Sequence, residues 1–379
     1  MDTRRGERIL LWSSIAVCFL LAEFFLRLFH PQKTETQLLR DYPAMYSEST
    51  WVDYALTPGF VGRHRTSEFD TEIRLNSLGQ RQREIDIEKG DQQRVLVIGD
   101  SFTFGWGVEE PQSYPRLVEA QLDGNTERRI EVVNAGFTGG FYPDAYFVYL
   151  GQNGLALEPD LVLIGMYIGN DIDGPAARTR VWEEVDENGL PLRVRSGSTE
   201  TVDGRRVRRE KSFRYRIPVL KNSHVAQLLY EGGKRIHRSF RPLRQQLKKI
   251  RLYETDYEGK TLENFERVKK LMIAMSELSR AHGAGFAVVM LPTREQVDPA
   301  PYESLEGLDF DKPQRIFSEF FAEHEIAYLD LLPAMRAATD GNTFYYIDDS
   351  HWNARGHAFA AQAIAAFLGR EGLLGASGG

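Results

Sequence analysis

Cysteine is almost absent from this chain, and that excludes several kinds of site. The single Cys18 cannot form an intramolecular disulfide, a zinc finger or a CxxC redox site, although it leaves the cellular compartment open. An excess of positive charge is also lacking, since the net charge of −7 argues against a nucleic-acid binder. With 42% hydrophobic and 27% charged residues, the 379-residue chain has an ordinary globular composition. This composition excludes a disordered, collagen-like or polytopic membrane protein.

One apolar run stands near the N-terminus, at residues 9–29. As a helix these 21 residues would span about 31 Å, which matches the hydrocarbon thickness of a bilayer. Arg4, Arg5 and Arg8 precede the run and predict that residues 1–8 form a cytoplasmic tail. The sequence therefore predicts a single-pass protein of the inner (cytoplasmic) membrane, with the rest of the chain extracytoplasmic, or periplasmic.

Two alternatives to a membrane anchor remain open. A cleaved signal peptide would need small residues after the run, where Glu23, Arg27 and His30 stand instead. A lipoprotein would use Cys18, but the bulky Val17 precedes it. An acid inside a span is costly, so we interpret Glu23 as a residue tolerated near the interface. The anchor is the favoured interpretation.

Strands and helices alternate through the rest of the chain. Short apolar runs predict five buried strands, at 94–98, 130–134, 161–167, 286–291 and 327–331. Apolar periodicity and a proline predict helices at 111–122, 262–282, 312–324 and 354–368. This order is typical of an α/β fold, a three-layer α/β/α sandwich with a mainly parallel, flavodoxin-like sheet. Ligands of such sheets gather at the carboxyl ends of the strands.

The flanking segments are less regular. We expect a stalk and N-terminal cover at 30–90, a main domain at 91–369 and a flexible tail at 370–379. The main domain carries an insertion at about 172–260. Within it, residues 201–251 hold sixteen Lys and Arg against three acids, a balance of +13 that leaves −20 for the rest of the chain. This basic segment is either a solvated helical surface or a face that contacts a polyanion such as anionic lipid or polysaccharide.

The strand ends hold residues suited to acyl chemistry. Ser101 follows the first strand in the turn GDSFTFG (99–105), although it could also be an ordinary helix cap. In NAGFTGG (134–140), glycines such as Gly139 let a backbone N–H approach a ligand. Asn170, in GND at 169–171, can donate from its side chain, or can be a plain turn residue.

A short loop, DDSHWN (348–353), precedes the last helix. Ester hydrolysis needs a nucleophile, a base, an acid that orients the base, and oxyanion donors. Ser101, His351 and Asp348 supply the first three, and Gly139 and Asn170 supply donors. A metal site at Asp348, Asp349, His351 and His357 is disfavoured, because the chain shows no other metal-ligand spacing. His64, His224, His237, His282 and His324 are interpreted as surface or core histidines.

Together these ordered blocks resemble the SGNH (GDSL-type) hydrolase superfamily, over about 94–170 and 285–368. The resemblance implies Ser101 as nucleophile, His351 as base and Asp348 as acid, through a D-x-x-H spacing that leaves Asp349 as the alternative acid. It also implies an oxyanion site made of the Ser101 and Gly139 N–H groups and the Asn170 amide. The segment LNSLGQRQRE (75–84), with the N-terminal helix, resembles a membrane-anchored bacterial branch. No G-x-S-x-G motif is present, which disfavours an α/β-hydrolase.

The resemblance implies a serine esterase that needs no cofactor or metal. From the anchor we expect its substrate to be an O-acyl ester, such as an O-acetyl ester, on a cell-envelope glycan. Three alternatives stay open: an O-acyltransferase on envelope polysaccharide, a lipase or lysophospholipase acting on a lipid ester, and a non-catalytic glycan-binding assembly protein. The expected partners are thus the acylated substrate, the inner membrane and a polyanion at 201–251, with no nucleic acid.

Overall fold

The computed structural model covers the chain with gaps. It describes residues 3–32, 45–47, 49–52, 55–66, 68–122, 129–138, 141–172, 180–196, 199–202, 205–208, 217, 220, 222–239, 250–339 and 343–374. The expected cytoplasmic tail is described from Thr3 onward, and the second half of the expected C-terminal tail, residues 375–379, lies outside these residues.

Five parallel strands form the central sheet, in the order β13-β12-β7-β5-β6. Their bounds are β5 (Gln93–Gly99), β6 (Ile130–Gly136), β7 (Leu161–Tyr167), β12 (Gly285–Leu291) and β13 (Ala327–Asp330). Each lies within a residue or two of the strand expected from its apolar run. The predicted fold class, α/β with a mainly parallel sheet, is confirmed.

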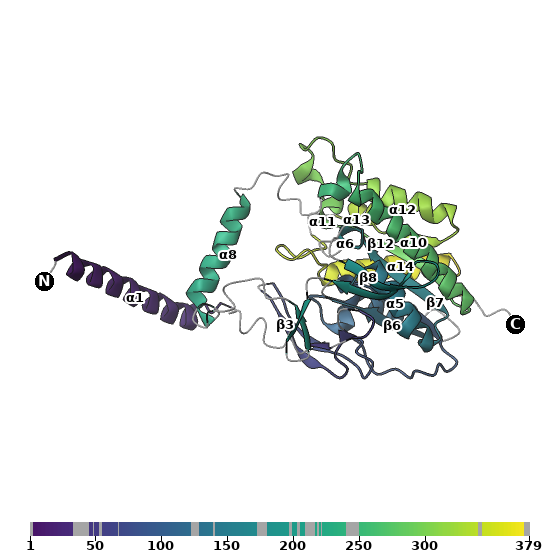
Figure 1. Ribbon diagram of the computed structural model, residues 1–379, viewed down its shortest axis with the longest axis horizontal. Coiled ribbons are helices and arrows are strands. Elements are labelled where there is room, and N and C mark those ends of the chain that lie inside the picture. The colour runs from purple at the N-terminus through teal and green to yellow at the C-terminus, as the bar shows by residue number, and fades with distance from the viewer. Residues whose placement is uncertain are drawn as a thin grey trace.

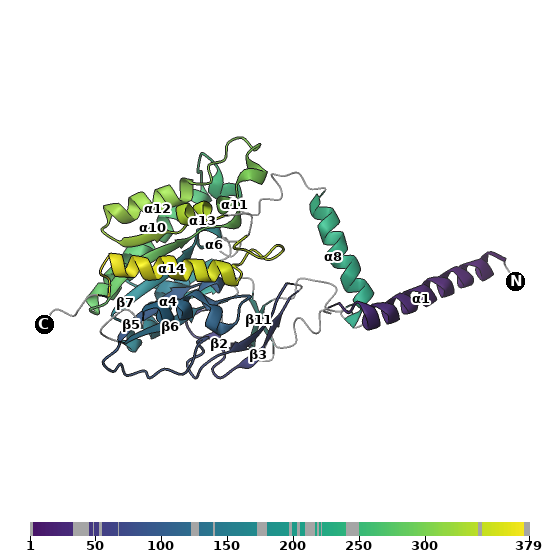
Figure 2. The ribbon, with the colours of Figure 1, turned by 180° about the vertical axis from the view of Figure 1, so that it is seen from behind.

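Helices cover both faces of this sheet, because alternate strand residues point to opposite sides. Leu96 and Ile98 of β5 pack with one layer, and Val95 and Val97 pack with the other. The first layer holds α5 (Pro143–Tyr149), α10 (Lys260–Ala281) and α12 (Lys312–Glu323). The second holds α4 (Tyr114–Leu122), α13 (Leu332–Ala337) and α14 (Ala354–Arg370), and α14 lies in front of the sheet in Figure 2 and behind it in Figure 1.

Two details of the expected helices differ. The stretch expected as one helix at 111–122 is split into a 3₁₀ turn, Glu110–Gln112, and α4, with Ser113 in extended backbone between them. In α10 the apolar stripe is buried as expected from Phe265 to Met275, but Leu262 in the first turn is 49% exposed. The further short helices are α3 (Ser101–Phe104), α6 (Ile168–Asp171), α11 (Arg294–Val297), a π-helical turn at Leu150–Gly154, and 3₁₀ turns at Leu155–Leu157, Ile250–Tyr253 and Ala300–Tyr302.

The described residues of the segment expected as a stalk and cover form four short strands. They pair as β1 (Tyr46–Ser47) with β2 (Ala55–Leu56) and β3 (Val61–Arg65) with β4 (Asp70–Arg74), both antiparallel. Met45, Leu56, Ile73 and Leu75 pack around Phe104, three residues after Ser101. This cover, residues 45–87 as far as they are described, is thus packed against the turn that carries the candidate nucleophile.

Where the insertion is described, it contains two antiparallel hairpins and one long helix. β8 (Arg180–Val185) pairs with β9 (Pro191–Ser196), and β10 (Thr199–Val202) pairs with β11 (Arg205–Arg208). α8 (His224–Ser239) follows. The basic segment 201–251 was expected to be helical if it is a solvated surface, yet its first part is a hairpin strand. Residues 203–204, 209–216, 218–219, 221 and 240–249 of it lie outside the described residues.

The apolar N-terminal helix is α1 (Thr3–Phe29), and its residues 6–29 are apolar and long enough to cross a membrane. Near its end Glu23 is buried and caps the start of α8. The Glu23 carboxylate accepts hydrogen bonds from Ser223 Oγ at 2.8 Å, His224 N at 2.9 Å and Val225 N at 3.0 Å. Figures 1 and 2 show α8 between α1 and the α/β domain, with one end of α8 against the end of α1. The acid that a span tolerates poorly thus has a structural partner.

Candidate active site

Ser101 stands at the carboxyl end of β5, where the strand turns sharply into α3. Asp100 caps this helix, since its Oδ1 accepts the Phe102 N–H at 2.9 Å. A Cβ on Gly99 would run into Thr103 Oγ1 and lie 2.9 Å from the Gly165 carbonyl oxygen. Glycine is therefore required at the turn, and it brings the Ser101 hydroxyl to the edge of the sheet.

His351 lies beside this hydroxyl. The distance from Ser101 Oγ to His351 Nε2 is 2.6 Å, within hydrogen-bond range, and 250 positions of chain separate the two residues. The expected nucleophile and base are thus brought together. This contact leaves the other ring nitrogen, Nδ1, to an orienting acid.

The acid on Nδ1 is Asp349, so the expectation of Asp348 is wrong in this structure. Asp349 Oδ1 accepts from His351 Nδ1 and also from the His351 backbone N–H at 3.0 Å. The loop turns tightly between the two residues, and a spacing of two positions rather than three aims the carboxylate at the ring. Asp348 lies one position earlier, and its backbone N–H donates to Glu68 at 3.0 Å.

Asp349 is held ionised. Burial raises its pKa, but hydrogen bonds and the charge interaction from His351, with a contribution from the Trp106 indole, outweigh burial and lower the pKa to about 2. The carboxylate is therefore negative throughout the neutral range. A negative partner on Nδ1 keeps the proton there and leaves Nε2 able to accept one from Ser101.

Two aromatic side chains flank the base. The Phe102 ring centroid is 5.0 Å from that of His351, and Trp352, which is fully buried, packs edge-on against Phe102 at 5.1 Å. On the other side the Trp106 centroid lies 5.7 Å from that of His351. Trp106 therefore borders the His351 ring.

His64, expected to be a surface or core histidine, is a core histidine next to the site. It comes from β3 of the cover, and its ring lies 3.7 Å from that of Trp106. Burial lowers the pKa of His64 to about 3, so its ring is neutral at physiological pH. The cover thereby supports the tryptophan that borders His351.

The oxyanion donors are only partly described. Asn170 is the third residue of the four-residue helix α6, and its Nδ2 donates to Asp100 Oδ2 at 2.8 Å. A side-chain amide carries two N–H donors, so one donor remains for a ligand. The Ser101 N–H belongs to the first turn of α3, where a helix leaves its N–H groups without intrahelical partners. Gly139 lies outside the described residues.

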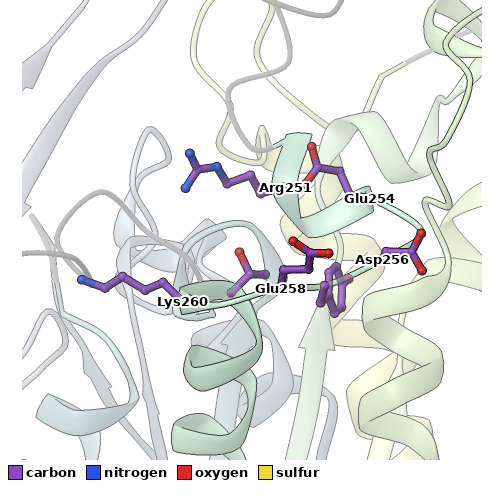
Figure 3. Close-up of a pocket in the computed structure, with 7 residues that line it drawn as sticks. Arg251, Glu254, Asp256, Glu258 and Lys260 are labelled. Carbon is purple, nitrogen blue, oxygen red and sulfur yellow. The ribbon is translucent and has the colours of Figure 1, made fainter.

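Other constellations in the described part of the chain are less suited to catalysis. No three His, Cys, Asp or Glu side chains there are grouped as metal ligands. His357 is fully buried and accepts the Tyr114 N–H at 3.3 Å, away from Asp349. Figure 3 shows a separate pocket of about 290 Å³ whose wall mixes acids and bases, namely Arg251, Glu254, Asp256, Tyr257, Glu258, Lys260 and Thr261. That wall holds neither a serine nor a histidine.

A family model matches one part of the chain. Residues 252–378 match the family model described as the SGNH hydrolase-like domain of the acetyltransferase AlgX. No curated protein matches the chain. The matched segment includes His351 and Asp349, whereas Ser101 and Asn170 lie before it.

Several solved structures are similar to the chain at low identity. They include a lipase/acylhydrolase from Enterococcus faecalis (14% identity, 74% of this chain and 97% of that one, TM-score 0.41). An acetyl-xylooligosaccharide esterase from Geobacillus Stearmophilus (16%, 74% and 95%, 0.40) and TesA (14%, 73% and 98%, 0.39) are also similar. The resemblance to the SGNH superfamily, expected from the four motif blocks, is confirmed by the family model over residues 252–378.

Proposed function

We propose that this protein is a serine esterase that hydrolyses O-acyl esters through an acyl-enzyme on Ser101. The observation that carries the proposal is the continuous chain of contacts from Ser101 Oγ through the His351 ring to the ionised Asp349. Nucleophile, base and orienting acid in hydrogen-bond contact form the arrangement that activates a serine toward an acyl carbon.

In the proposed reaction Ser101 Oγ attacks the ester carbonyl while His351 Nε2 takes the hydroxyl proton. The carbonyl oxygen becomes an oxyanion, which the Ser101 N–H, the second N–H of Asn170 and the N–H of Gly139 would stabilise. His351 then returns its proton to the leaving alcohol, and the acyl group stays on Ser101. Water then attacks the acyl-serine while His351 takes its proton. His351 gives that proton to Ser101 Oγ as the acid leaves, which restores the free serine.

The substrate class follows from where the site would lie. We propose that α1 anchors the protein in the inner membrane with the catalytic domain outside the cytoplasm. In Figures 1 and 2 the short helices α6 and α11, which follow the carboxyl ends of β7 and β12, lie on the side of the domain that faces α8 and α1. A site that faces the anchor favours an ester on an envelope glycan close to the membrane, such as an O-acetyl ester. The basic segment 201–251 is proposed to contact a polyanion there.

Acyl transfer to a sugar hydroxyl is the second candidate, and one observation favours it. The family model that matches residues 252–378 is described as the SGNH hydrolase-like domain of an acetyltransferase. The same acyl-enzyme serves both reactions, and the acceptor that reaches it, water or an alcohol, decides the product. Transfer would require the acceptor to occupy the space that water otherwise enters.

The test compares release of the acetyl group as free acetate with its transfer to a glycan. The purified full chain in detergent is given p-nitrophenyl acetate alone and then with a glycan acceptor, and both free acetate and acetylated glycan are measured. We expect p-nitrophenol release and free acetate that depend on Ser101. Acetylated glycan formed at the expense of free acetate would replace the esterase by the transferase, and absence of p-nitrophenol release with short-chain and long-chain esters would refute both.

A further inference from the structure

The turn between β3 and β4 of the cover reaches the loop that carries the acid and the base. Its Glu68 carboxylate accepts three successive backbone N–H groups: Ile347 N at 2.6 Å, Asp348 N at 3.0 Å and Asp349 N at 2.7 Å. The first contact uses Oε1, and the other two share Oε2. A carboxylate that takes N–H donors makes charge-assisted bonds, which are stronger than neutral ones.

The loop at 347–350 is irregular. Its residues are neither helix nor strand, and the Ile347 side chain is 72% exposed. Contacts around it include the Tyr345–Trp352 bridge, the Tyr346 N to His351 O bond of 3.0 Å, and Arg294, which donates to the Ile347 carbonyl at 2.9 Å. The bridge and the Tyr346 bond fix the base of the loop. Glu68 fixes its tip, where the Asp349 backbone lies.

We propose that Glu68 is a positioning residue that sets the Asp349 carboxylate against His351. The proposal rests on the proposed function, because it assigns Glu68 a part in that same triad. Glu68 does not touch the reacting atoms. It acts through the Asp349 backbone, and a displacement of about 1 Å in such an arrangement can lower a rate by about 10²-fold.

Arg81, a second residue of the cover, holds the segment that carries Trp106. Arg81 is 1% exposed and donates to the carbonyl oxygens of Glu72 at 2.8 Å and Val108 at 2.7 Å, and also to that of Gly105. The segment between Gly105 and Val108 carries Trp106, which borders His351. The cover therefore contacts both the loop that carries Asp349 and the segment that carries Trp106. We expect its removal to lower both activity and stability.

The test compares Glu68→Gln and Glu68→Ala with the same two changes at Glu72. Glu72 lies in the same hairpin, but its carboxylate pairs with the exposed Arg74. Glutamine keeps one acceptor oxygen, which can hold the Asp348 and Asp349 N–H groups, and places an N–H₂ against Ile347. We expect kcat to fall about 10-fold for Glu68→Gln and about 10²-fold for Glu68→Ala. KM and the melting temperature should be little changed, and the Glu72 variants should match the wild type.

Fluorophosphonate labelling and the kinetics of the Glu68 variants distinguish failure of the proposed function from failure of the positioning role. If the wild-type chain is not labelled at Ser101 by a fluorophosphonate, the proposed function fails. If it is labelled and Glu68→Ala reacts as fast as wild type, the positioning role alone is overturned. If Glu68→Ala does not fold, the isosteric Glu68→Gln decides: a lower kcat at unchanged KM supports the role, and wild-type kcat refutes it. A fall in melting temperature with unchanged kcat for the folded fraction would also refute it.

Discussion

Asparagine in place of Asp349, with Asp348→Asn as its matched control, separates two adjacent carboxylates that the sequence does not distinguish. Both changes keep the side-chain shape and the backbone N–H groups that bond to Glu68. We expect Asp349→Asn to lower kcat by about 10³-fold. Asp348→Asn should change it by less than about 3-fold, because Asp349 and not Asp348 contacts the His351 ring.

The magnitude follows from the charges. His351 becomes a cation when it takes the Ser101 proton, while Asp349, with its pKa lowered to about 2 by hydrogen bonds and the charge of His351 against the effect of burial, stays an anion. Two unit charges about 4 Å apart attract by about 4 kcal/mol at an effective dielectric constant of about 20. That attraction corresponds to about 10³-fold in rate. An asparagine amide keeps a hydrogen bond but loses the charge.

The assay is kcat and KM on p-nitrophenyl acetate at pH 7 to 8, with a melting curve for each variant. A large loss in Asp348→Asn together with wild-type activity in Asp349→Asn would refute the geometric assignment and restore the D-x-x-H acid. Wild-type activity in both variants would mean that neither carboxylate assists His351.

Four further outcomes are expected. Asn170→Ala should lower kcat by about 10²- to 10³-fold through loss of an oxyanion donor, and an unchanged rate would remove Asn170 from the site. Burial lowers the pKa of His357 to about 3, so the unfolded chain binds a proton below pH 6.5 that the folded chain does not, and stability is lost as the pH falls from there toward 3. His357→Gln should therefore make the melting temperature less acid-sensitive between pH 7 and 4, and an equal slope would contradict this. A phosphatase reporter fused after residue 40 should be active and the full chain should resist alkaline carbonate washing, whereas a mature chain that lacks residues 1–25 would refute the anchor. Activity on an anionic glycan ester should fall as salt rises while a neutral ester is unaffected, and the same selective loss should follow reversal of four arginines to glutamate; equal effects on both substrates would reject the polyanion contact. The four are Arg205, Arg206, Arg208 and Arg209.

The sheet could be predicted because its strands are buried on both faces. Runs such as 94–98 and 161–167 are apolar without interruption, and helical segments separate them, so a parallel sheet follows from sequence. The same logic located Ser101 and Asn170 at strand ends and His351 before the last helix. Parallel strands end at one edge, and this brings together residues far apart in the chain.

The sequence could not show which of the two aspartates contacts the His351 ring. Asp348 and Asp349 are adjacent in a loop, and the direction of each side chain depends on the turn between Asp349 and His351. That turn is held by Glu68, about 280 positions earlier, and no local pattern in the sequence signals the contact. An acid at the tip of a short polar hairpin is ordinarily solvated, so Glu68 gives no signal by its type or its neighbours.

The cover and the insertion were expected, but their strands were not predicted, for a related reason. Strands of two to six residues with mixed polarity carry too few periods to identify. β3 shows no regular alternation of buried and exposed positions, and β4 alternates over only five residues. Arg81 gave the opposite signal, because a charged residue is rarely buried, yet it is 1% exposed and bonded to backbone carbonyls. The segment LNSLGQRQRE could be noticed as a motif, but its role required the structure.

The most direct test of the account is to map the serine that reacts with a fluorophosphonate in the full-length protein. Digestion and mass spectrometry should place a single adduct on Ser101. Labelling should be lost in Ser101→Ala and strongly slowed in His351→Ala, because the hydroxyl would lose the base 2.6 Å away. An adduct on another serine, or labelling of Ser101 at the same rate in His351→Ala, would contradict the proposed nucleophile and its activation.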